Sequence, residues 1–407
     1  MKVKMKVKVY LNSYNKKQFV GLLHEDEKKR IYFEYNADFI KSGIELSPFK
    51  LPLQSGIFED KDYTFNGLYG LFNDSLPDGW GCLLIDKALK KERGLSYAAI
   101  TPLTRLSYAG ITGMGALEYE PIYDEISYTE SALNLDTLAH EIQNIIAELP
   151  SSKLDELITL NASANGARPK ILVNVSHDKK NIISGMQSKN LKFSSTPYNT
   201  CSPWIIKFSA ENDSKNHSKN LGIEEYVYSL MAKKAGIEMP ETYLFPSKKC
   251  AGYFGVKRFD RIGQEKIHIH SACGLLHASH RYSSIDYETL LKLTWTLTKN
   301  KEDLLKVFRL MIFNVKSCNK DDHTKNFSFL LDRNNTWHFA PAYDITPTLG
   351  RNNEQTLAVN GKGIDITKED FIQVGEKFSI ERKNTLEIIE EIDVSLAEYQ
   401  KLLKEYS

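Results

Sequence analysis

The sequence has 407 residues, 42% hydrophobic and 26% charged, which is enough for two or three packed units of an ordinary globular protein. Its 53 Lys and Arg residues against 52 Asp and Glu residues leave a net charge of +1, which disfavours direct binding to nucleic acid, because that binding usually depends on a basic excess. The five cysteines are scattered and form no C-x-x-C pair, which argues against a disulfide framework and fits a reducing cytoplasm.

The first 125 residues predict mixed strand and helix. Residues 1–9 alternate Lys with apolar side chains, which is typical of a half-buried strand and unlike a signal peptide. A further strand is expected around 32–35, and Pro-Asp-Gly within 75–80 predicts a turn. Glycines crowd residues 110–115, but 116–121 then look like a strand. A phosphate-binding glycine loop should open a helix, so we interpret the glycines as a turn.

The middle of the chain alternates helices and strands. Apolar residues at helical spacing predict helices over 133–149 and over 223–235, the second ending at Gly236. Between them and after them, strands are expected at residues 171–175, 204–209, 242–245 and 253–259. The polar stretch 176–202 predicts a mobile loop.

From residue 280 onward the periodicity is mostly helical, with helices expected around 290–297, 304–312 and 386–403. Nowhere does an apolar run approach the length that crosses a bilayer, so no membrane partner is expected and the protein should be cytoplasmic. The order of elements predicts an α+β, two-lobed protein-kinase-like fold with an additional N-terminal α/β subdomain and a mostly helical C-terminal lobe. The expected boundaries are 1–125, 126–258 and 259–407.

The segment from Asn319 to Asn326 carries the chemistry. Asp321 and Asn326 are five residues apart, the D-x-x-x-x-N spacing of a kinase catalytic loop. Phosphoryl transfer needs a carboxylate that orients the attacking hydroxyl and oxygen ligands for magnesium. An expected hairpin, 327–331 with 337–340, leads from this loop to Asp344, which supplies a second carboxylate. The alternative is that these polar residues form only a solvated turn and that Asp344 caps a following segment.

The run Asn-x-Asp-Asp-His-x-Lys-Asn-Phe at 319–327, followed by Ala-Pro-Ala-Tyr-Asp at 340–344, resembles the signature of HipA-type serine/threonine kinases, the toxins of bacterial toxin–antitoxin pairs. Further similarities lie in 75–80, 166–170, 204–208 and 258–261, so the resemblance covers nearly the whole chain. The ordered set of motifs is more specific than any one of them.

The resemblance implies a role for each matching residue of the helical half. Asp321 would orient the acceptor hydroxyl, and Asn326 and Asp344 would hold Mg²⁺. His323 would approach the phosphates of ATP. Departures from the family pattern are Cys318, where Gly is frequent, and Glu224-Glu225, where Asn-Glu is frequent; of these two we favour Glu225 as the partner of the ATP lysine.

For the N-terminal half, the resemblance implies that Lys207 pairs with the α- and β-phosphates and that backbone groups of Lys257 and Phe259 meet the adenine edge. The expected phosphate-covering loop contains Gly166, Ala167 and Lys170, and it begins near Ser163, where family members autophosphorylate. Considered without the resemblance, Lys207 could equally be an outward-facing strand residue, and Ser163 could serve only to shape the backbone.

Two other clusters have simpler interpretations. His268, His270, His277 and His280 could suggest zinc, but they lack the tight ligand spacing of structural sites, so we expect a turn-rich connector. Asp260 and Arg261 are expected to form a salt bridge near the hinge rather than to contact a ligand.

The sequence therefore predicts an ATP- and Mg²⁺-dependent serine/threonine protein kinase. The resemblance implies a small helix-turn-helix antitoxin partner that supplies the DNA contact, and a protein substrate in the translation apparatus, such as an aminoacyl-tRNA synthetase. The alternatives are a phosphotransferase acting on a small molecule and a non-catalytic corepressor of a DNA-binding antitoxin.

Overall fold

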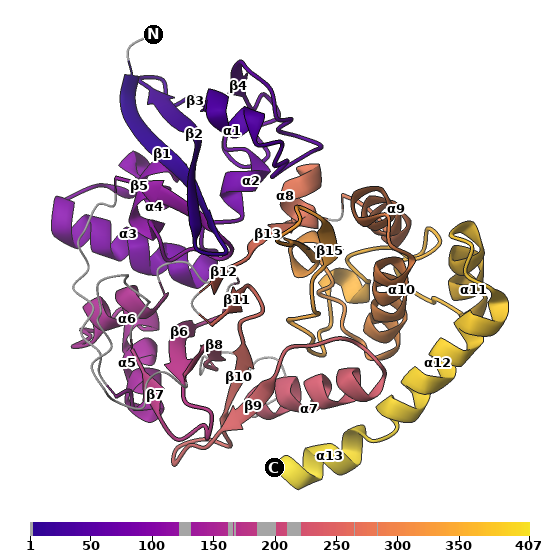
Figure 1. Ribbon diagram of the computed structural model, residues 1–407. Coiled ribbons are helices and arrows are strands. Elements are labelled where there is room, and N and C mark those ends of the chain that lie inside the picture. The colour runs from indigo at the N-terminus through magenta and orange to yellow at the C-terminus, as the bar shows by residue number, and fades with distance from the viewer. Residues whose placement is uncertain are drawn as a thin grey trace. The chain divides into compact units, whose positions relative to one another are not determined.

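The computed structural model describes residues 3–121, 132–161, 166, 168–184, 201–209, 221–263, 265–282 and 284–407. Figure 1 labels the helices and strands along the chain. The chain divides into two units. Unit 1 comprises Met1–Gly222 and Tyr243–Ile269, and unit 2 comprises Ile223–Thr242 and His270–Ser407. The predicted division at residues 125 and 258 stays a prediction.

The first sheet of unit 1 is antiparallel, with the order β4-β3-β2-β1-β5. Its strands are β1 (Val3–Ser13), β2 (Lys16–Asp26), β3 (Ile31–Tyr35), β4 (Ile57–Glu59) and β5 (Leu117–Glu120). The alternation at the N-terminus acts as predicted: Val7 and Val9 are buried, whereas Lys6 and Lys8 are exposed. The glycines before β5 form a turn, which confirms that interpretation.

The helices of unit 1 are mostly short. They are α1 (Ala37–Lys41), α2 (Gly70–Asn73), α3 (Gly79–Arg93), η1 (Tyr97–Ala99), α4 (Pro102–Ala109), α5 (Leu135–Ile146) and α6 (Leu154–Asn161). Helix α5 confirms the periodicity prediction. The sequence predicts only a turn at Pro-Asp-Gly, but the structure also begins a helix there. Asp78 occupies the N-cap position of α3, which has 15 residues and ends at the left-handed Gly94.

The second sheet of unit 1 has the order β7-β6-β8-β10-β9. Its strands are β6 (Lys170–Val175), β7 (Ile182–Ile183), β8 (Ser202–Lys207), β9 (Thr242–Phe245) and β10 (Tyr253–Lys257). The expected strands are all present, and β7 lies within the predicted loop 176–202, of which 185–200 lie outside the described residues. A hydrophobic core joins α3, α5 and α6 to this sheet, with Leu84, Ile142 and Trp204 fully buried.

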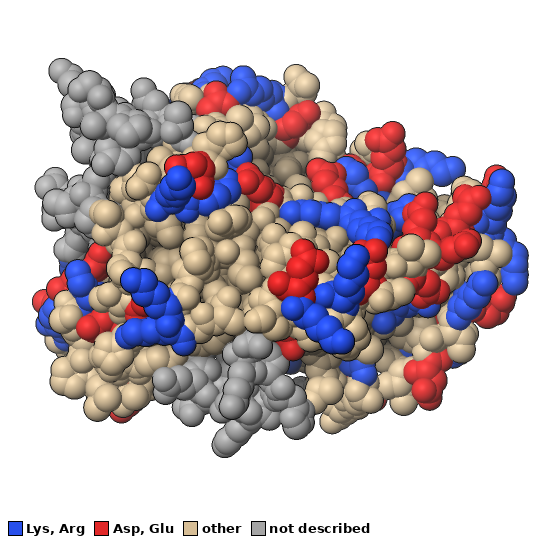
Figure 2. Space-filling view, turned by 90° about the horizontal axis from the view of Figure 1, so that it is seen from below, with Lys and Arg blue, Asp and Glu red and all other residues tan. Residues whose placement is uncertain are grey.

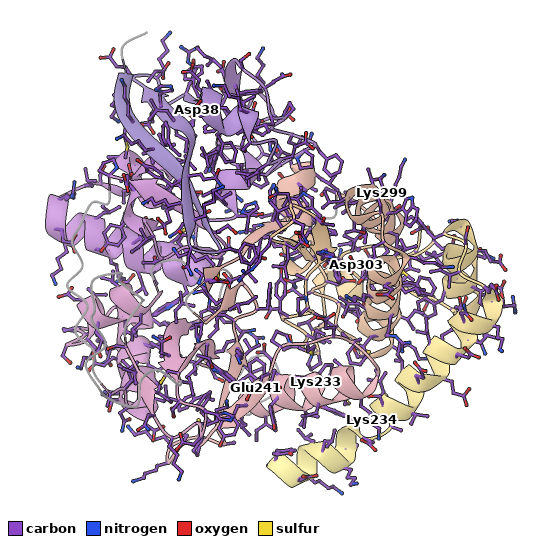
Figure 3. All side chains as sticks on the ribbon, viewed as in Figure 1. Asp38, Lys233, Lys234, Glu241, Lys299 and Asp303 are labelled. Atoms are coloured by element: carbon purple, nitrogen blue, oxygen red, sulfur yellow. The ribbon has the colours of Figure 1, made fainter. Side chains whose placement is uncertain are left out.

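Unit 2 is mostly helical. Its helices are α7 (Leu221–Lys234, the first two residues belonging to unit 1), α8 (Ala272–Leu276), α9 (Tyr287–Thr298), α10 (Lys301–Lys316), α11 (Lys368–Lys377), α12 (Arg382–Leu396) and α13 (Tyr399–Tyr406). Helices α9 and α10 confirm the periodicity prediction. Left-handed Lys299 ends α9, and Asn300 caps the start of α10, in which Asp303 is buried (Figure 3).

A small sheet, β13-β14-β15, completes the architecture. Strand β13 covers His268–Ser271, and β14 (Ser328–Leu331) and β15 (Trp337–Phe339) form the antiparallel hairpin that the sequence predicts. The histidine-rich segment is therefore not a turn-rich connector: β13 and α8 follow a two-stranded ribbon of β11 (Arg261–Ile262) and β12 (Glu265–Lys266). The polar His and Ser residues of β13 concealed the strand.

Basic and acidic side chains are interspersed over the face seen in Figure 2, in keeping with the near-zero net charge. Among the described residues, no helix is both long enough and apolar enough to cross a membrane.

Candidate active site

The segment 318–326, termed the Asp321 loop below, begins where α10 ends. Ser317 caps α10, and Cys318 adopts a left-handed conformation with φ of 60° that turns the chain away from the helix axis. The backbone N–H of Asn319 donates to the carbonyl of Asn314 at 2.9 Å, and its side chain donates to the Asn314 side chain at 3.0 Å. The loop is therefore anchored to the last turns of a buried helix.

Asp321 and Asn326 are joined within the loop. The Asn326 side-chain nitrogen donates to the backbone carbonyl of Asp321 at 2.8 Å. The oxygen Oδ1 is the atom through which Asn326 would bind a cation, because the amide nitrogen only donates hydrogen bonds. Asp321 itself is exposed, so its carboxylate is accessible to a substrate.

Asp322, next in sequence, points into the protein and is 0% exposed. One of its carboxylate oxygens accepts from the Tyr287 hydroxyl at 2.6 Å and from the Gln355 side chain at 3.1 Å. The other accepts from the backbone N–H groups of Thr356 at 2.8 Å and Leu357 at 3.4 Å. Burial among these neutral donors raises the pKa of Asp322 to about 6, because the donors only partly offset the loss of solvent. Sequence reasoning missed this anchor.

The hairpin leads from the Asp321 loop to Asp344, as predicted. Tyr343 fixes the end of the hairpin, because its hydroxyl donates to the backbone carbonyl of Lys325 at 2.6 Å and lies 2.6 Å from the Ser328 hydroxyl. Asp344 is left-handed, with φ of 57°. This conformation costs about 1 kcal/mol in a residue other than glycine, and such outliers cluster at functional sites.

Asn326 and Asp344 carry oxygen atoms of the kind that a magnesium ion prefers as ligands. Mg²⁺ prefers oxygen ligands and is usually held by one or two carboxylates together with substrate phosphates. Asp344 offers a carboxylate and Asn326 an amide oxygen. His323, at the start of the turn η4 (Thr324–Asn326), is half-buried, and its ring centre lies 5.5 Å from that of His280.

Two lysines of unit 1 are brought together. Lys170 and Lys207 are direct partners across β6 and β8. Directly opposite residues of an antiparallel pair project from the same face, and like charges there are unfavourable unless an anion lies nearby. The Lys207 ammonium lies 5.7 Å from the centre of the Phe254 ring. A sheet face that carries two lysines at directly opposite positions is suited to a polyanion.

Gly166 lies beside the buried Lys170. Its φ is 100°, a backbone conformation that favours glycine, and a Cβ there would lie 2.2 Å from the Nζ at the end of the Lys170 side chain. The Gly166 N–H also donates to the Asp78 carboxylate at 3.1 Å, which ties this position to the start of α3. Ser163 and Ala167, the other predicted residues of this loop, lie outside the described residues.

Lys257 ends β10, and Phe259 lies in the turn that follows. Phe259 is flanked by a buried ionic cluster. The Asp260 carboxylate accepts from Arg258 at 2.7 and 2.9 Å, from Arg261 at 2.7 Å and from the backbone N–H of Gly115 at 2.8 Å. Burial opposes ionisation of Asp260, but the two guanidinium groups hold its pKa well below the ordinary range. The predicted salt bridge is confirmed.

The glycine turn at 110–115 thus has a structural role that the sequence did not reveal. Arg261 donates to the carbonyls of Gly113 at 3.0 Å and Gly115 at 2.9 Å. Nearby, Glu118 of β5 pairs with Lys266 of β12 at 2.9 Å. The Arg261 hydrogen bonds and the Glu118–Lys266 ion pair therefore fasten the segment after β10 to β5 and to the turn before it.

A cavity of about 460 Å³ in unit 2 is separate from these residues. Its apolar walls come from Ile237, Leu305, Phe339, Ala340, Ala342 and Ile388. Its rim carries the ion pairs of Lys306 with Glu238 and of Arg309 with Glu391. None of the predicted site residues lines it.

The protein has a mixed α/β fold. Its candidate site combines the anchored Asp321 loop with a hairpin that leads to a second carboxylate, Asp344. Two family profiles match the chain: HipA N-terminal domain over residues 8–120 and HipA-like C-terminal domain over residues 162–398. The second match alone covers more than half of the sequence. The chain belongs to the HipA family.

Known proteins agree with this assignment at the level of fold. A solved structure of HipA from Shewanella oneidensis MR-1, in complex with HipB and operator DNA of that toxin–antitoxin system, is 17% identical with a TM-score of 0.67, covering 98% of this chain and 90% of that chain. A Haemophilus influenzae protein named provisionally as a kinase is 25% identical over 276 residues, 58% of this chain and 74% of that protein. The structure of the Helicobacter pylori proinflammatory kinase CtkA is 13% identical with a TM-score of 0.32, covering 50% of this chain and 86% of that chain.

Proposed function

We propose that this protein is a serine/threonine protein kinase with a two-lobed, kinase-like fold, which transfers the γ-phosphoryl group of ATP to a protein hydroxyl. The observation that carries the proposal is the Asp321 loop, in which an exposed carboxylate is tied to Asn326 five residues later. A hairpin then leads to Asp344, a carboxylate in a strained conformation. The relative named as a kinase supports the same reaction class.

In this proposal Asp321 orients the acceptor hydroxyl and accepts its proton. Asn326 and Asp344 would hold Mg²⁺, which when bound neutralises phosphate charge, and His323 would approach the phosphates. Little covalent work falls to the protein, so the rate depends on holding Asp321 in place and on charge complementarity.

The residues of unit 1 would bind the nucleotide. Lys207 would pair with the α- and β-phosphates, and the paired Lys170 would add a second positive charge on the same sheet face. Gly166 and Ala167 would belong to a phosphate-covering loop, and backbone groups of Lys257 and Phe259 would meet the adenine edge. The ionic cluster around Asp260 would keep that backbone in place.

We further propose that the chain is the toxin of a toxin–antitoxin pair in the cytoplasm. The Shewanella HipA structure contains HipB and operator DNA, which supports a small DNA-binding antitoxin as partner. This chain, with its net charge of +1, would reach DNA only through that partner. The proposed substrate belongs to the translation apparatus, such as an aminoacyl-tRNA synthetase, and Ser163 is the proposed autophosphorylation site.

Label transfer from γ-labelled ATP in the presence of Mg²⁺ tests the reaction class. Wild type, Asp321→Asn and the control Asp332→Asn are each incubated alone and with bacterial lysate. Asp332 is half-buried in the hairpin turn of the same unit and is not a predicted site residue. We expect label on this chain or on a discrete lysate protein with wild type and the control, and its loss in Asp321→Asn. Absence of any transfer by wild type would favour the small-molecule or corepressor alternative.

A further inference from the structure

Thr348, four residues after Asp344, holds the backbone of the Asp321 loop. Its hydroxyl oxygen accepts hydrogen bonds from the backbone N–H groups of Lys320 at 2.9 Å and Asp321 at 2.8 Å. Its own N–H donates to the carbonyl of Cys318 at 3.0 Å. Thr348 also pairs with Asn319 as a parallel β-bridge, so one residue holds the first part of the loop. All these residues belong to unit 2.

These bonds complete the fixing of Asp321. The N–H of Asp321 is bound by Thr348, and its carbonyl is bound by the Asn326 side chain at 2.8 Å. The direction from which the Asp321 carboxylate meets a substrate depends on the backbone that carries it, and Thr348 binds that backbone directly. Without the Thr348 hydroxyl, the N–H groups of Lys320 and Asp321 would lose this acceptor.

The chain after Thr348 continues to pack closely against the Asp321 loop. Gly350 has φ of 62°, and a Cβ there would lie 2.7 Å from the Cβ of Lys320 and 2.4 Å from the carbonyl of Glu354. Thr356 then donates its hydroxyl to the carbonyl of Lys320 at 2.8 Å. This close approach, which only glycine allows, shows that the contact between Thr348 and the loop belongs to a tightly packed arrangement.

We propose that Thr348 is a positioning residue of the phosphoryl transfer, acting through the backbone of Asp321. The inference rests on the proposed kinase function and adds to it a residue outside the loop. As the acceptor oxygen bonds to the γ-phosphorus, its proton passes to Asp321. The bond from the γ-phosphorus to the bridging oxygen breaks, and that electron pair leaves on ADP. Thr348 touches neither substrate; it sets the direction from which Asp321 meets the hydroxyl.

Three variants test this role. Thr348→Val removes the hydroxyl at nearly constant shape, Thr348→Ser retains it, and Thr346→Val makes the same change two residues away. Thr346 is also buried, and within the described residues no hydrogen bond joins its side chain to the Asp321 loop. Initial rates of label transfer to an acceptor protein in bacterial lysate are measured over a range of Mg-ATP concentrations. Hydrogen exchange of peptides spanning residues 318–322 is measured in the absence of substrate.

For Thr348→Val we expect kcat to fall by about 10- to 100-fold, since small misplacements of a catalytic group have effects of this order. KM for ATP should stay within about threefold, because nucleotide contacts are intact. The amides of Lys320 and Asp321 should exchange faster. Thr348→Ser should restore both slow exchange and most of kcat, and Thr346→Val should resemble wild type.

An unchanged kcat in Thr348→Val, with wild-type transfer intact, would overturn the positioning role alone. So would a loss of kcat that Thr348→Ser does not restore, or a loss that Thr346→Val reproduces. Absence of transfer by wild type would overturn the proposed kinase function and the inference with it, so the two failures are distinguishable.

Discussion

Asp260 in unit 1 and Asp322 in unit 2 are both 0% exposed, yet the pKa values of their carboxyl groups move in opposite directions. Burial disfavours the charged form of both. Asp260 accepts from two guanidinium groups, which outweigh burial and lower its pKa. Asp322 accepts only from neutral hydroxyl, amide and backbone groups, so burial prevails and its pKa rises to about 6.

The difference shows that the charge of the hydrogen-bond donors, rather than their presence, decides whether the pKa of a buried carboxyl group is raised or lowered. The Asp260 cluster pairs its carboxylate with two guanidinium groups and joins the segment after β10 to the turn before β5. The Asp322 cluster carries a single unbalanced charge and orders the loop on which Asp321 stands. The first arrangement is suited to holding segments together and the second to positioning a reactive neighbour.

The largest expected effect comes from removing the charge of Asp260. Asp260→Asn leaves Arg258 and Arg261, which are 5% and 9% exposed, buried without their counter-charge. Breaking a buried pair from one side costs about 3–5 kcal/mol. The free energy of unfolding, measured with urea, should fall by this amount. The control is Asp155→Asn at an exposed pair with Lys91, where a change below about 1 kcal/mol is expected. Equal effects of the two substitutions would contradict the proposed role of the Asp260 cluster in stability.

Acid should weaken the ionic contacts of unit 1. Burial opposes ionisation of Glu118, but Lys266 and the Asn12 side chain hold its pKa at about 2. An unfolded Glu has a pKa of about 4.3, so the stabilisation is present above that value and is lost as pH falls toward about 2. Up to about 3 kcal/mol is involved, at about 1.4 kcal/mol per pKa unit. The gap in unfolding free energy between wild type and Glu118→Gln should therefore shrink on acidification. A constant gap would refute this assignment.

Asp322 should behave in the opposite sense. Its folded pKa of about 6 lies above an unfolded value of about 3.9, so its contribution is fully present below about pH 4 and is lost as pH rises through about 6. Relative to Asp322→Asn, the free energy of unfolding of wild type should fall by up to about 3 kcal/mol as pH rises from about 4 to about 6. A wild-type-minus-variant difference that is flat or rises with pH would show that the neutral donors compensate the charge fully.

A smaller effect is expected from Asp322→Asn at neutral pH. The new amide group would direct N–H bonds at groups that are themselves donors, such as Tyr287 and the Thr356 backbone, at a cost of about 1–3 kcal/mol. Label transfer should fall more than stability does, because the Asp321 loop loses its anchor. A fall in stability with unchanged transfer would separate Asp322 from the reaction.

The sequence predicted the parts of the fold and site whose signals are local. The D-x-x-x-x-N spacing, the hairpin after it, the strands β6, β8, β9 and β10 and the helices α9 and α10 all lie in short continuous stretches, whereas β7 lies within a predicted loop. Helix α3 was missed because Pro-Asp-Gly was interpreted only as a turn, whereas its Asp occupies the N-cap position.

What the sequence could not reveal is long-range satisfaction of buried polar groups. Asp322 and Thr348 depend on contacts with residues 27–35 positions away, and Thr, Gln and Tyr carry no distinctive sequence pattern that indicates such pairing. Two adjacent acidic residues, such as Asp321 and Asp322, are one sequence signal that a loop side chain points into the protein. A loop residue that points inward must find donors, and searching for them requires the fold.

The measurement that tests the central proposal most directly separates nucleotide binding from chemistry in the same samples. Mg-ATP binding by calorimetry and label transfer are compared for wild type, Asp321→Asn and Lys207→Met. We predict that Asp321→Asn binds Mg-ATP within about threefold of wild type but transfers label at least about 100-fold more slowly. Lys207→Met should lose binding and transfer together. Wild-type transfer rates in Asp321→Asn, or no binding of Mg-ATP by wild type, would contradict the account.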